Sequence, residues 1–391
     1  MWNRIKQNGI VLLIIALTVL VTVFLQNFCF KSYSRYASDT LHYEKAVVVE
    51  VLSEDLEYDE NLKITLGTQE LQVRMLDGEE KGKTLEITNY LTQTHNVYAE
   101  NGTKLIINAD RPEGDVEPYY TVYNYDRTLP LISCFVVLAV AVICIGGGKG
   151  VKSIAGLVYS LFLIVYMVLP AVFSGYSPIL MSIICGILST AVTLLLLNGN
   201  SEKTWAAILS TLLGVICSLI FFLVISWLVH IDGFSTSEAE SLVLINQETG
   251  LQIKDVLFAG VLISSLGAIM DTGMSIVSAL YEVYTHNKEL TAKELFRSGI
   301  EMGKDMIGTM TNTLILAFTG SAFITLLVFL SYQVQPAQLF NSNYLTIEIA
   351  QGICGTFGIV LTVPAASFIA AAVLAKKKKK KKKTAPDGVW E

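Results

Sequence analysis

Long runs of apolar residues alternate with short polar segments along most of the chain. A helix of about 20 apolar residues is long enough to cross the hydrocarbon core of a membrane, and eight runs reach this length. The pattern therefore predicts a polytopic α-helical membrane protein with eight transmembrane helices, the last seven forming a bundle over residues 128–375. The runs lie at residues 10–29, 129–146, 153–173, 178–198, 205–229, 256–281, 306–331 and 347–375.

The first run predicts a membrane helix that is retained. Arg4 and Lys6 precede it, as basic residues precede the apolar part of a signal peptide, but the run ends in Gln26-Asn27-Phe28-Cys29-Phe30. A cleavage site has small residues at that point, and this sequence has none there. We therefore expect residues 1–30 to form an N-terminal signal anchor.

A different pattern occupies residues 31–127, between the first and second apolar runs. Short stretches rich in Val, Ile, Leu, Thr and Tyr are broken by Asp77-Gly78, Lys81-Gly82 and Asn101-Gly102, as in strands joined by hairpins. Five or six strands in a domain of about 80 residues most simply form a small OB or SH3-like barrel. The expected strands lie at residues 46–52, 62–67, 70–76, 84–88, 104–108 and 119–124.

Basic residues indicate how the chain is oriented. Short loops rich in Lys and Arg remain in the cytoplasm, and the basic clusters all fall on one side of the eight expected spans. We therefore expect both termini to be cytoplasmic and residues 31–127 to be an extracytoplasmic domain. The clusters are Arg4 and Lys6, Lys149 and Lys152, Lys203, Lys288 to Lys304, and Lys376 to Lys383.

Composition agrees with a membrane protein and gives no sign of a nucleic-acid partner. The chain is 52% hydrophobic and 16% charged, with a net charge of −6, whereas a nucleic-acid-binding surface needs a basic patch. The polylysine tail, residues 376–391, directly follows a span, and the lipid bilayer is its expected partner. It most simply anchors the topology. A regulatory lipid switch and a cloning artefact are the alternatives.

Cysteine and histidine give no sign of a metal centre, and we expect no cofactor. The six cysteines lie in or beside the apolar runs, without the spacing of a metal site or a disulfide framework. We expect them to be reduced and buried. His42 and His95 have no partner at ligand spacing, and the acidic residues near Glu54 and Asp59 lack the spacing of an EF-hand.

Candidate chemistry begins with Asp271, the one acidic residue expected in the middle of a span. A charge there costs roughly 2.5 to 3.5 kcal/mol on insertion scales, so such residues are normally neutral, paired or hydrated. Asp271 belongs to a stripe of small and polar residues, whose glycines and serines are explained by close helix packing. Asp271 itself either binds a proton or cation or makes a structural hydrogen bond. The stripe consists of Gly260, Ser264, Gly267, Asp271, Ser275, Ser278 and Glu282.

The last two expected spans add further polar groups. Threonine hydroxyls can bond to their own helix, and those that do not could present oxygen atoms to an ion. Pro364 removes a helix hydrogen bond and is expected to kink its span, while Glu348 is either a pathway residue or an interfacial one. The charged entrance comprises Glu301, Lys304, Asp305 and Glu348; the ion or solute pathway comprises Asp271, Ser275, Thr309, Thr311, Asn312 and Gln351; the hinge and packing positions are Gly267, Gly308, Gly355, Gly358 and Pro364.

Three blocks of sequence, residues 267–271, 303–317 and 348–364, resemble the YibE/F family of bacterial multipass membrane proteins. The resemblance covers nearly the whole chain, including the expected β domain. Lys304 stands where the family pattern has arginine, so the positive charge remains but the planar donor group is lost. The resemblance implies a bacterial plasma membrane location, largely in Gram-positive bacteria, and it supplies little chemistry.

These features favour a transporter or channel for an ion or small solute, because polar groups at membrane depth normally line a pathway. Asp271 would couple a proton or cation, and the lack of an ATP-binding P-loop implies that any energy comes from a gradient. The alternative is a non-transporting envelope platform whose β domain recruits an extracytoplasmic protein. An enzyme is not expected, because metalloprotease and serine-hydrolase motifs are missing.

Overall fold

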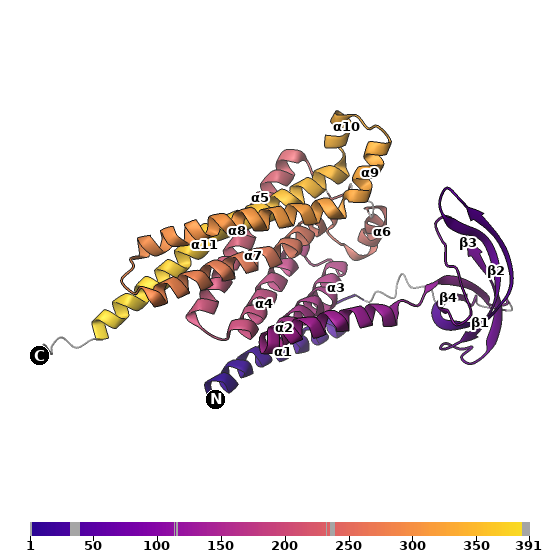
Figure 1. Cartoon of the computed structure of the whole chain (residues 1–391), viewed down its shortest axis with the longest axis horizontal. Helices are drawn as coiled ribbons and strands as arrows, with labels where there is room; N and C mark the ends of the chain where they lie inside the picture. Colours follow the sequence, from indigo (N-terminus) through magenta and orange to yellow (C-terminus); the bar gives the residue numbers. More distant parts are fainter. Residues whose placement is uncertain are drawn as a thin grey trace, which may run out of the picture. The chain divides into compact units, whose positions relative to one another are not determined.

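The computed structural model describes residues 2–31, 40–112, 114, 116–231, 233–234 and 239–384. The chain divides into two compact units (Figure 1), which are described separately. The helical unit comprises Met1–Lys31 and Val142–Glu391, and the sheet unit comprises Ser32–Ala141. The end of the expected polylysine tail, residues 385–391, lies outside the described residues.

The sheet unit contains a five-stranded antiparallel half-barrel with the strand order β3-β2-β1-β4-β5. The first strand is long enough to pair with two neighbours: its first half pairs with β4 and its second half with β2. The edge strands β3 and β5 also come into contact. The strands are β1 (Leu41–Asp59), β2 (Ile64–Met75), β3 (Thr84–Leu91), β4 (Lys104–Asp110) and β5 (Tyr119–Tyr125).

The expectation of separate strands at 62–67 and 70–76 is wrong, because β2 runs continuously through both. Gly67 stands opposite Leu56 in the β1–β2 ladder. Its φ is 128°, and a Cβ atom there would collide with the carbonyl oxygen of Asp55. Glycine therefore allows the strand to pass close to β1 at the point where the first of the two expected strands ended. The other expected strands are present, with longer ends.

Alternating side chains of the strands form the core of the sheet unit. Ala46, Leu71 and Leu105 are fully buried, as the period of two in a half-buried strand requires. Two buried amides lie among them: the Asn89 side chain donates to Gln69 at 3.0 Å and to the carbonyl oxygen of Val97 at 2.7 Å. Buried amides need such partners, and these bonds hold the segment before β4 against the sheet.

The helical unit is built from long apolar helices. Among the described residues, six are long and apolar enough to cross a membrane, or seven if α8 and α9, which meet at a bend of 57°, count as one span. The helices are α1 (Trp2–Phe28), α2 (Thr128–Phe162), π-helical η2 (Leu163–Val168), α3 (Leu169–Phe173), α4 (Pro178–Asn198), α5 (Glu202–Val229), α6 (Ala239–Thr249), α7 (Ile253–His286), α8 (Ala292–Ser321), α9 (Phe323–Ser331), α10 (Pro336–Phe340) and α11 (Asn343–Thr384).

The count differs from the expected eight because the runs at 129–146 and 153–173 belong to one helical stretch, Thr128–Phe173. Gly147 interrupts this stretch with non-helical backbone angles, φ 55° and ψ −135°. A Cβ atom at Gly150 would collide with the carbonyl oxygen of Val142. Residues eight apart in a straight helix are separated by about 12 Å, so the chain folds back at this turn.

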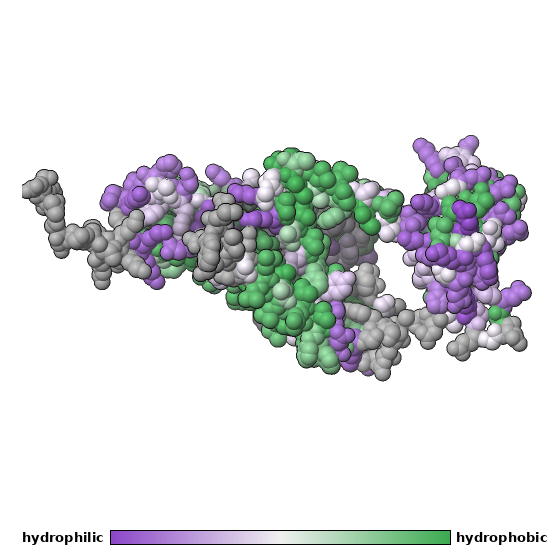
Figure 2. Space-filling view, turned by 90° about the horizontal axis from the view of Figure 1, so that it is seen from below, coloured by the Kyte–Doolittle hydropathy of each residue, from purple (hydrophilic) through white to green (hydrophobic). Residues whose placement is uncertain are grey.

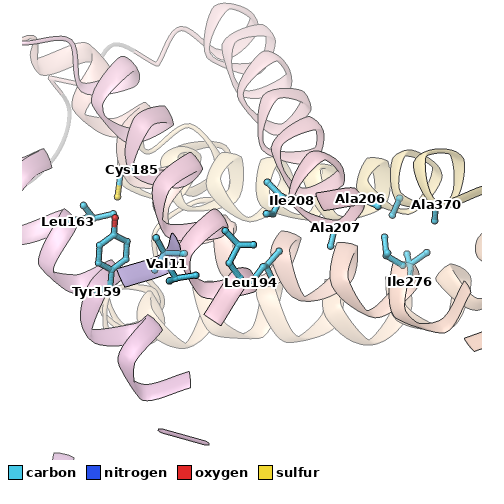
Figure 3. Close-up of a cluster of buried hydrophobic side chains, with 14 of the residues drawn as sticks. Val11, Tyr159, Leu163, Cys185, Leu194, Ala206, Ala207, Ile208, Ile276 and Ala370 are labelled. Atoms are coloured by element: carbon cyan, nitrogen blue, oxygen red, sulfur yellow. The ribbon is translucent and has the colours of Figure 1, made fainter. Parts of the chain in front are cut away.

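Buried side chains from nine of these helical segments form the main core of the helical unit, part of which is drawn in Figure 3. Tyr159 and Leu163 pack beside Cys185 of α4, and Ile276 of α7 is fully buried in the same cluster. The helices α7, α8 and α11 run side by side (Figure 1). Helix α11 includes Pro364 within its length. This core fixes which face of each helix is turned inward.

Hydrophobic residues cover much of the outer surface of the helical unit, and hydrophilic residues gather at one end of it (Figure 2). Such a surface suits a hydrocarbon environment, in which an apolar exterior is solvated by lipid. The six cysteines are free. The expectation that all are buried is wrong for Cys29, Cys134 and Cys144, which are exposed: Cys29 follows the end of α1, and the other two lie on a face of α2 that is not packed within the chain.

Candidate functional site

The two faces of α7 differ in what they contact. Ile269, Thr272 and Ile276 are buried against the other helices. The polar stripe lies on the opposite side, so the expectation that its members share one side of the helix is met. Gly260, Ser264, Gly267, Asp271, Ser275 and Glu282 are exposed, and Ser278 is half-buried.

The exposed face of α7 is not closely packed within the chain. A Cβ atom at Gly260 or Gly267 would meet no other atom within 4 Å. Asp271 lies 18 residues after Ile253, or about 27 Å along a helix that is about 51 Å long. Its carboxylate has no hydrogen bond or ion pair with the described residues. The stripe therefore carries an unpaired acid at mid-length.

An open groove of about 640 Å³, lined by both polar and apolar side chains, lies at the C-terminal end of the stripe. Ser275, Ser278 and Glu282 form one wall of it. Lys149, from the glycine-rich turn in α2, and Lys203, from the first turn of α5, line the same groove, together with Asn198 at the end of α4. Four helices, α2, α4, α5 and α7, thus contribute to one open site.

The hydroxyls in this groove differ from the others in α7. Those of Ser264, Ser265 and Thr272 donate to backbone carbonyls of their own helix at 2.8 to 3.1 Å. No such bond occurs within the described residues for Ser275 or Ser278. Back-bonding normally occupies hydroxyls in a membrane helix, so the two that line the groove keep their donors available.

The charged entrance expected on α8 is at the surface of the chain. The Lys304 ammonium lies 2.8 Å from the Glu301 carboxylate, and both side chains are more than half exposed. Asp305 is also exposed, and so is Gly308, beside which a Cβ atom would meet nothing within 4 Å. Helix α8 turns Leu295, Gly299 and Gly303 inward instead.

The threonines that follow divide into bonded and unbonded groups. The Thr309 hydroxyl donates to the Asp305 and Met306 carbonyls, and Thr313 donates to the Thr309 carbonyl at 2.9 Å. This confirms that part of the polarity is satisfied by the helix itself. The buried hydroxyl of Thr311 has no hydrogen-bond partner among the described residues, and Asn312 is exposed.

Two expected residues lie near the start of α11. Glu348 borders an apolar pocket of about 170 Å³, together with Phe318, Thr319 and Gly352. One of its carboxylate oxygens is buried and has no hydrogen-bond partner in the described part of the chain. Gln351, one turn later, is half-buried. The described pockets, including a third beside His230, are not lined by Asp271, Asn312 or Gln351.

The expected packing glycines of α11 are buried at helix contacts. A Cβ atom at Gly355 would lie 2.7 Å from Leu314 of α8, and one at Gly358 would lie 2.7 Å from Ile269 of α7. By contrast, Gly267 and Gly308, expected to do the same work, are exposed. Small residues let membrane helices approach each other closely. Of these four expected glycines, only Gly355 and Gly358 have this role within the chain.

Several residues that shape the site were not among the sequence candidates. Gly299 and Gly303 have the four-residue spacing of a membrane packing motif, which would have identified them. Lys149 and Lys203 were interpreted only as topology signals, and no spacing in the sequence joins them to Ser275. Among the described residues there is no group of His, Cys, Asp or Glu that could hold a metal ion.

Comparison with known proteins places this bundle in a family. Neither the curated proteins nor the solved structures provided a match. A family model described as YibE/F-like protein matches residues 134–376, which leaves the five strands outside the matched region. The match is narrower than the resemblance over nearly the whole chain that the sequence suggested, but it covers more than half of the residues, and the chain therefore belongs to the YibE/F-like family.

Proposed function

We propose that this protein is a transporter or channel for an ion or small solute in a bacterial plasma membrane, with its pathway along the exposed face of α7. The observation that carries the proposal is the unpaired carboxylate of Asp271 on that face. Acids at membrane depth almost always face a bundle interior or a water-filled cavity. The exposed position of Asp271 favours a pathway bounded by the outer face of α7 over one enclosed among α5, α7 and α11.

The topology that accompanies this proposal has eight spans. The turn at Gly147 divides the stretch Thr128–Phe173 into two arms, each long enough to cross about 30 Å of hydrocarbon. With the bent pair α8 and α9 as one span, the total is eight. Short basic loops remain in the cytoplasm, so both termini would be cytoplasmic and residues 31–127 would be extracytoplasmic.

Energy for transport would come from a gradient, because the sequence has no ATP-binding P-loop. Asp271 is the group that would take up and release a proton or bind a cation. The groove lined by Ser275 and Glu282 would then be the cytoplasmic mouth of the pathway. Glu348 borders the apolar pocket at the other end of the bundle. It would be a second acid on the pathway, on the side of Asp271 away from the groove.

The second candidate is a membrane platform that recruits an extracytoplasmic protein. The sheet unit favours it, because it has its own buried core and its own network of buried amides. A five-stranded, partly open barrel is also an arrangement that OB folds use to bind ligands. This candidate does not explain an unpaired acid in the middle of α7.

Flux measurements in proteoliposomes test the proposal. The purified protein is reconstituted, and proton, monovalent-cation and divalent-cation fluxes are compared for the wild type, Asp271→Asn and Asp255→Asn. Asp255 is a matched control because it lies in the first turn of the same helix. We expect a flux that falls at least tenfold, or about 1.4 kcal/mol, only in Asp271→Asn. Folded protein without flux in this panel would favour the platform.

A further inference from the structure

The groove at the end of the α7 stripe brings together two cations that are far apart in sequence. Lys149 belongs to the turn where α2 folds back, and Lys203 belongs to the first turn of α5. Lys203 is half-buried. Neither ammonium is ion-paired within the described part of the chain, whereas Lys304 and Lys377 are paired with Glu301 and Glu202.

The one acid in the groove has a different partner. The Glu282 carboxylate lies 3.3 Å from Nε2 of His286, one helical turn further along α7. Both side chains are largely exposed, so this contact is a weak surface pair. It nevertheless draws the carboxylate toward the end of the helix. The positive charge contributed by Lys149 and Lys203 therefore exceeds the negative charge in the groove.

Neutral donors face the same space. The hydroxyls of Ser275 and Ser278 make no hydrogen bond within the described residues, unlike the neighbouring hydroxyls of α7. The Asn198 amide also lines the groove, and its only described contact is a 3.6 Å approach to the Met274 sulfur. Two cations and three neutral donors around about 640 Å³ form a site whose chemistry suits an oxyanion.

We propose that this groove binds a phosphate group, with Lys149 and Lys203 neutralising its charge and Ser275, Ser278 and Asn198 donating hydrogen bonds to its oxygens. Lysine is a common phosphate ligand that acts as a point charge. The phosphate can belong to an anionic lipid headgroup at the membrane surface or to a free phosphate in solution. The proposal does not depend on transport, because binding requires neither Asp271 nor a gradient.

Binding is measured with the full-length protein in two arms. In the first, the protein in phosphatidylcholine nanodiscs is titrated with inorganic phosphate by calorimetry. In the second, nanodiscs with and without phosphatidylglycerol are compared, and lipids retained after mild detergent extraction are counted by native mass spectrometry. Binding in the first arm identifies a free phosphate, and retention only in the second identifies a lipid headgroup.

The variants separate this site from general attraction to charge. Each lysine near an anionic surface contributes about fivefold, so the pair Lys149→Gln and Lys203→Gln is expected to weaken binding by about 30-fold. The control pair Lys288→Gln and Lys293→Gln removes the same charge from residues outside the groove. Ser275→Ala with Ser278→Ala retains both lysines and is expected to weaken binding severalfold. All variants are checked for an unchanged thermal midpoint.

Two results would overturn the proposal. One is an equal loss of binding in the groove pair and the control pair, because the attraction would then depend only on net charge. The other is the absence of both phosphate binding and phosphatidylglycerol retention in folded wild-type protein. The transport proposal can fail without affecting either result, because flux is not part of these measurements.

Discussion

The Ser218 hydroxyl of α5 donates a hydrogen bond of 2.9 Å to the backbone carbonyl oxygen of Cys354 in α11. Both residues are fully buried, and the bond crosses between two helices far apart in sequence. The carbonyl already belongs to the ladder of α11, so the serine adds a second bond to it. Gly358, one turn further along α11, makes room for the Ser218 side chain.

Removing this bond is expected to loosen the contact between α5 and α11. Side-chain hydrogen bonds between membrane helices average about 0.6 kcal/mol, so Ser218→Ala should reduce stability by about that amount. Steric trapping or reversible unfolding in mixed micelles measures the difference. Ser264→Ala is the control, because that hydroxyl bonds only to its own helix on an exposed face. Equal effects of the two substitutions would contradict an interhelical role.

Two glycines of α8 should respond differently to the same substitution. A Cβ atom at Gly303 would collide with Val363 of α11, whereas one at Gly308 would meet nothing within 4 Å. Overpacking a core typically costs about 1 to 3 kcal/mol, so Gly303→Ala should lower stability by that order. Gly308→Ala should be neutral or slightly stabilising, because alanine is the better helix former.

The measurement is the thermal midpoint of each variant in detergent, with monodispersity checked by size-exclusion chromatography. Should Gly308→Ala destabilise as much as Gly303→Ala, the exposed face of α8 would be packed against something outside the described chain. Asp305 and Asn312 are exposed on the same helix, so that outcome would mean that they too can be covered by a partner.

The sequence predicted the apolar helices well because hydropathy and length are local properties. It also predicted that Asp271 and Ser275 share one side of α7, since helical geometry fixes that relationship. It could not predict that this side faces outward, because the orientation of a helix depends on its neighbours. The inward face is set by close approaches such as the one at Gly273, where a Cβ atom would lie 3.1 Å from the Thr211 hydroxyl and 3.4 Å from the Thr362 side chain.

Contacts between residues far apart in sequence explain the features of the structure that the sequence did not predict. The continuity of β2 depends on how Gly67 passes Asp55, which is a tertiary contact. The groove depends on a turn in α2 that brings Lys149 beside the end of α7. Neither can be derived from spacing along the chain, and a lysine at a membrane boundary is already explained by topology.

The fold-back in α2 predicts a specific topology. Because Gly150 contacts Val142, the two arms of Thr128–Phe173 should leave the turn in the same direction. Cysteines introduced at Thr128 and at Tyr176 should then be labelled from the same side of the membrane, and one introduced at Lys149 from the opposite side. Membrane-impermeant maleimide on intact cells and on inverted vesicles makes the measurement, in a background without native cysteines.

A single long span would give a different labelling pattern. Thr128 and Tyr176 would then be accessible from opposite sides, and the count of spans would be seven at most.

Substituting Gly147 tests whether its backbone conformation causes the turn. Its φ of 55° with ψ of −135° is accessible essentially only to glycine, so Gly147→Val should reduce the yield of folded protein more than Gly146→Val does.

Ionisation of the Asp126 carboxyl group makes the stability at the start of α2 depend on pH. The Thr128 hydroxyl and its backbone N–H, the latter at 3.0 Å, donate to the Asp126 carboxylate, and Lys45 lies 3.8 Å away. These interactions lower the pKa of Asp126 below its usual value of 3.8. A lowered pKa in the folded state means that the stabilisation is complete above the unfolded pKa and is lost as the pH falls through the folded one.

Asp126→Asn should therefore destabilise the sheet unit at pH 7 and have a diminishing effect below about pH 4. The asparagine amide keeps one acceptor oxygen, so the substitution removes only the negative charge at the helix start, which contributes about 0.3 to 1 kcal/mol, or at most about 4 to 8 °C in a domain of this size. Calorimetry of the full-length wild type and variant at pH 7, 5 and 3 gives the comparison, with Asp110→Asn as the control. A difference between wild type and Asp126→Asn that persists unchanged at pH 3 would mean that the carboxylate charge does not contribute, and that the effect of the substitution is steric.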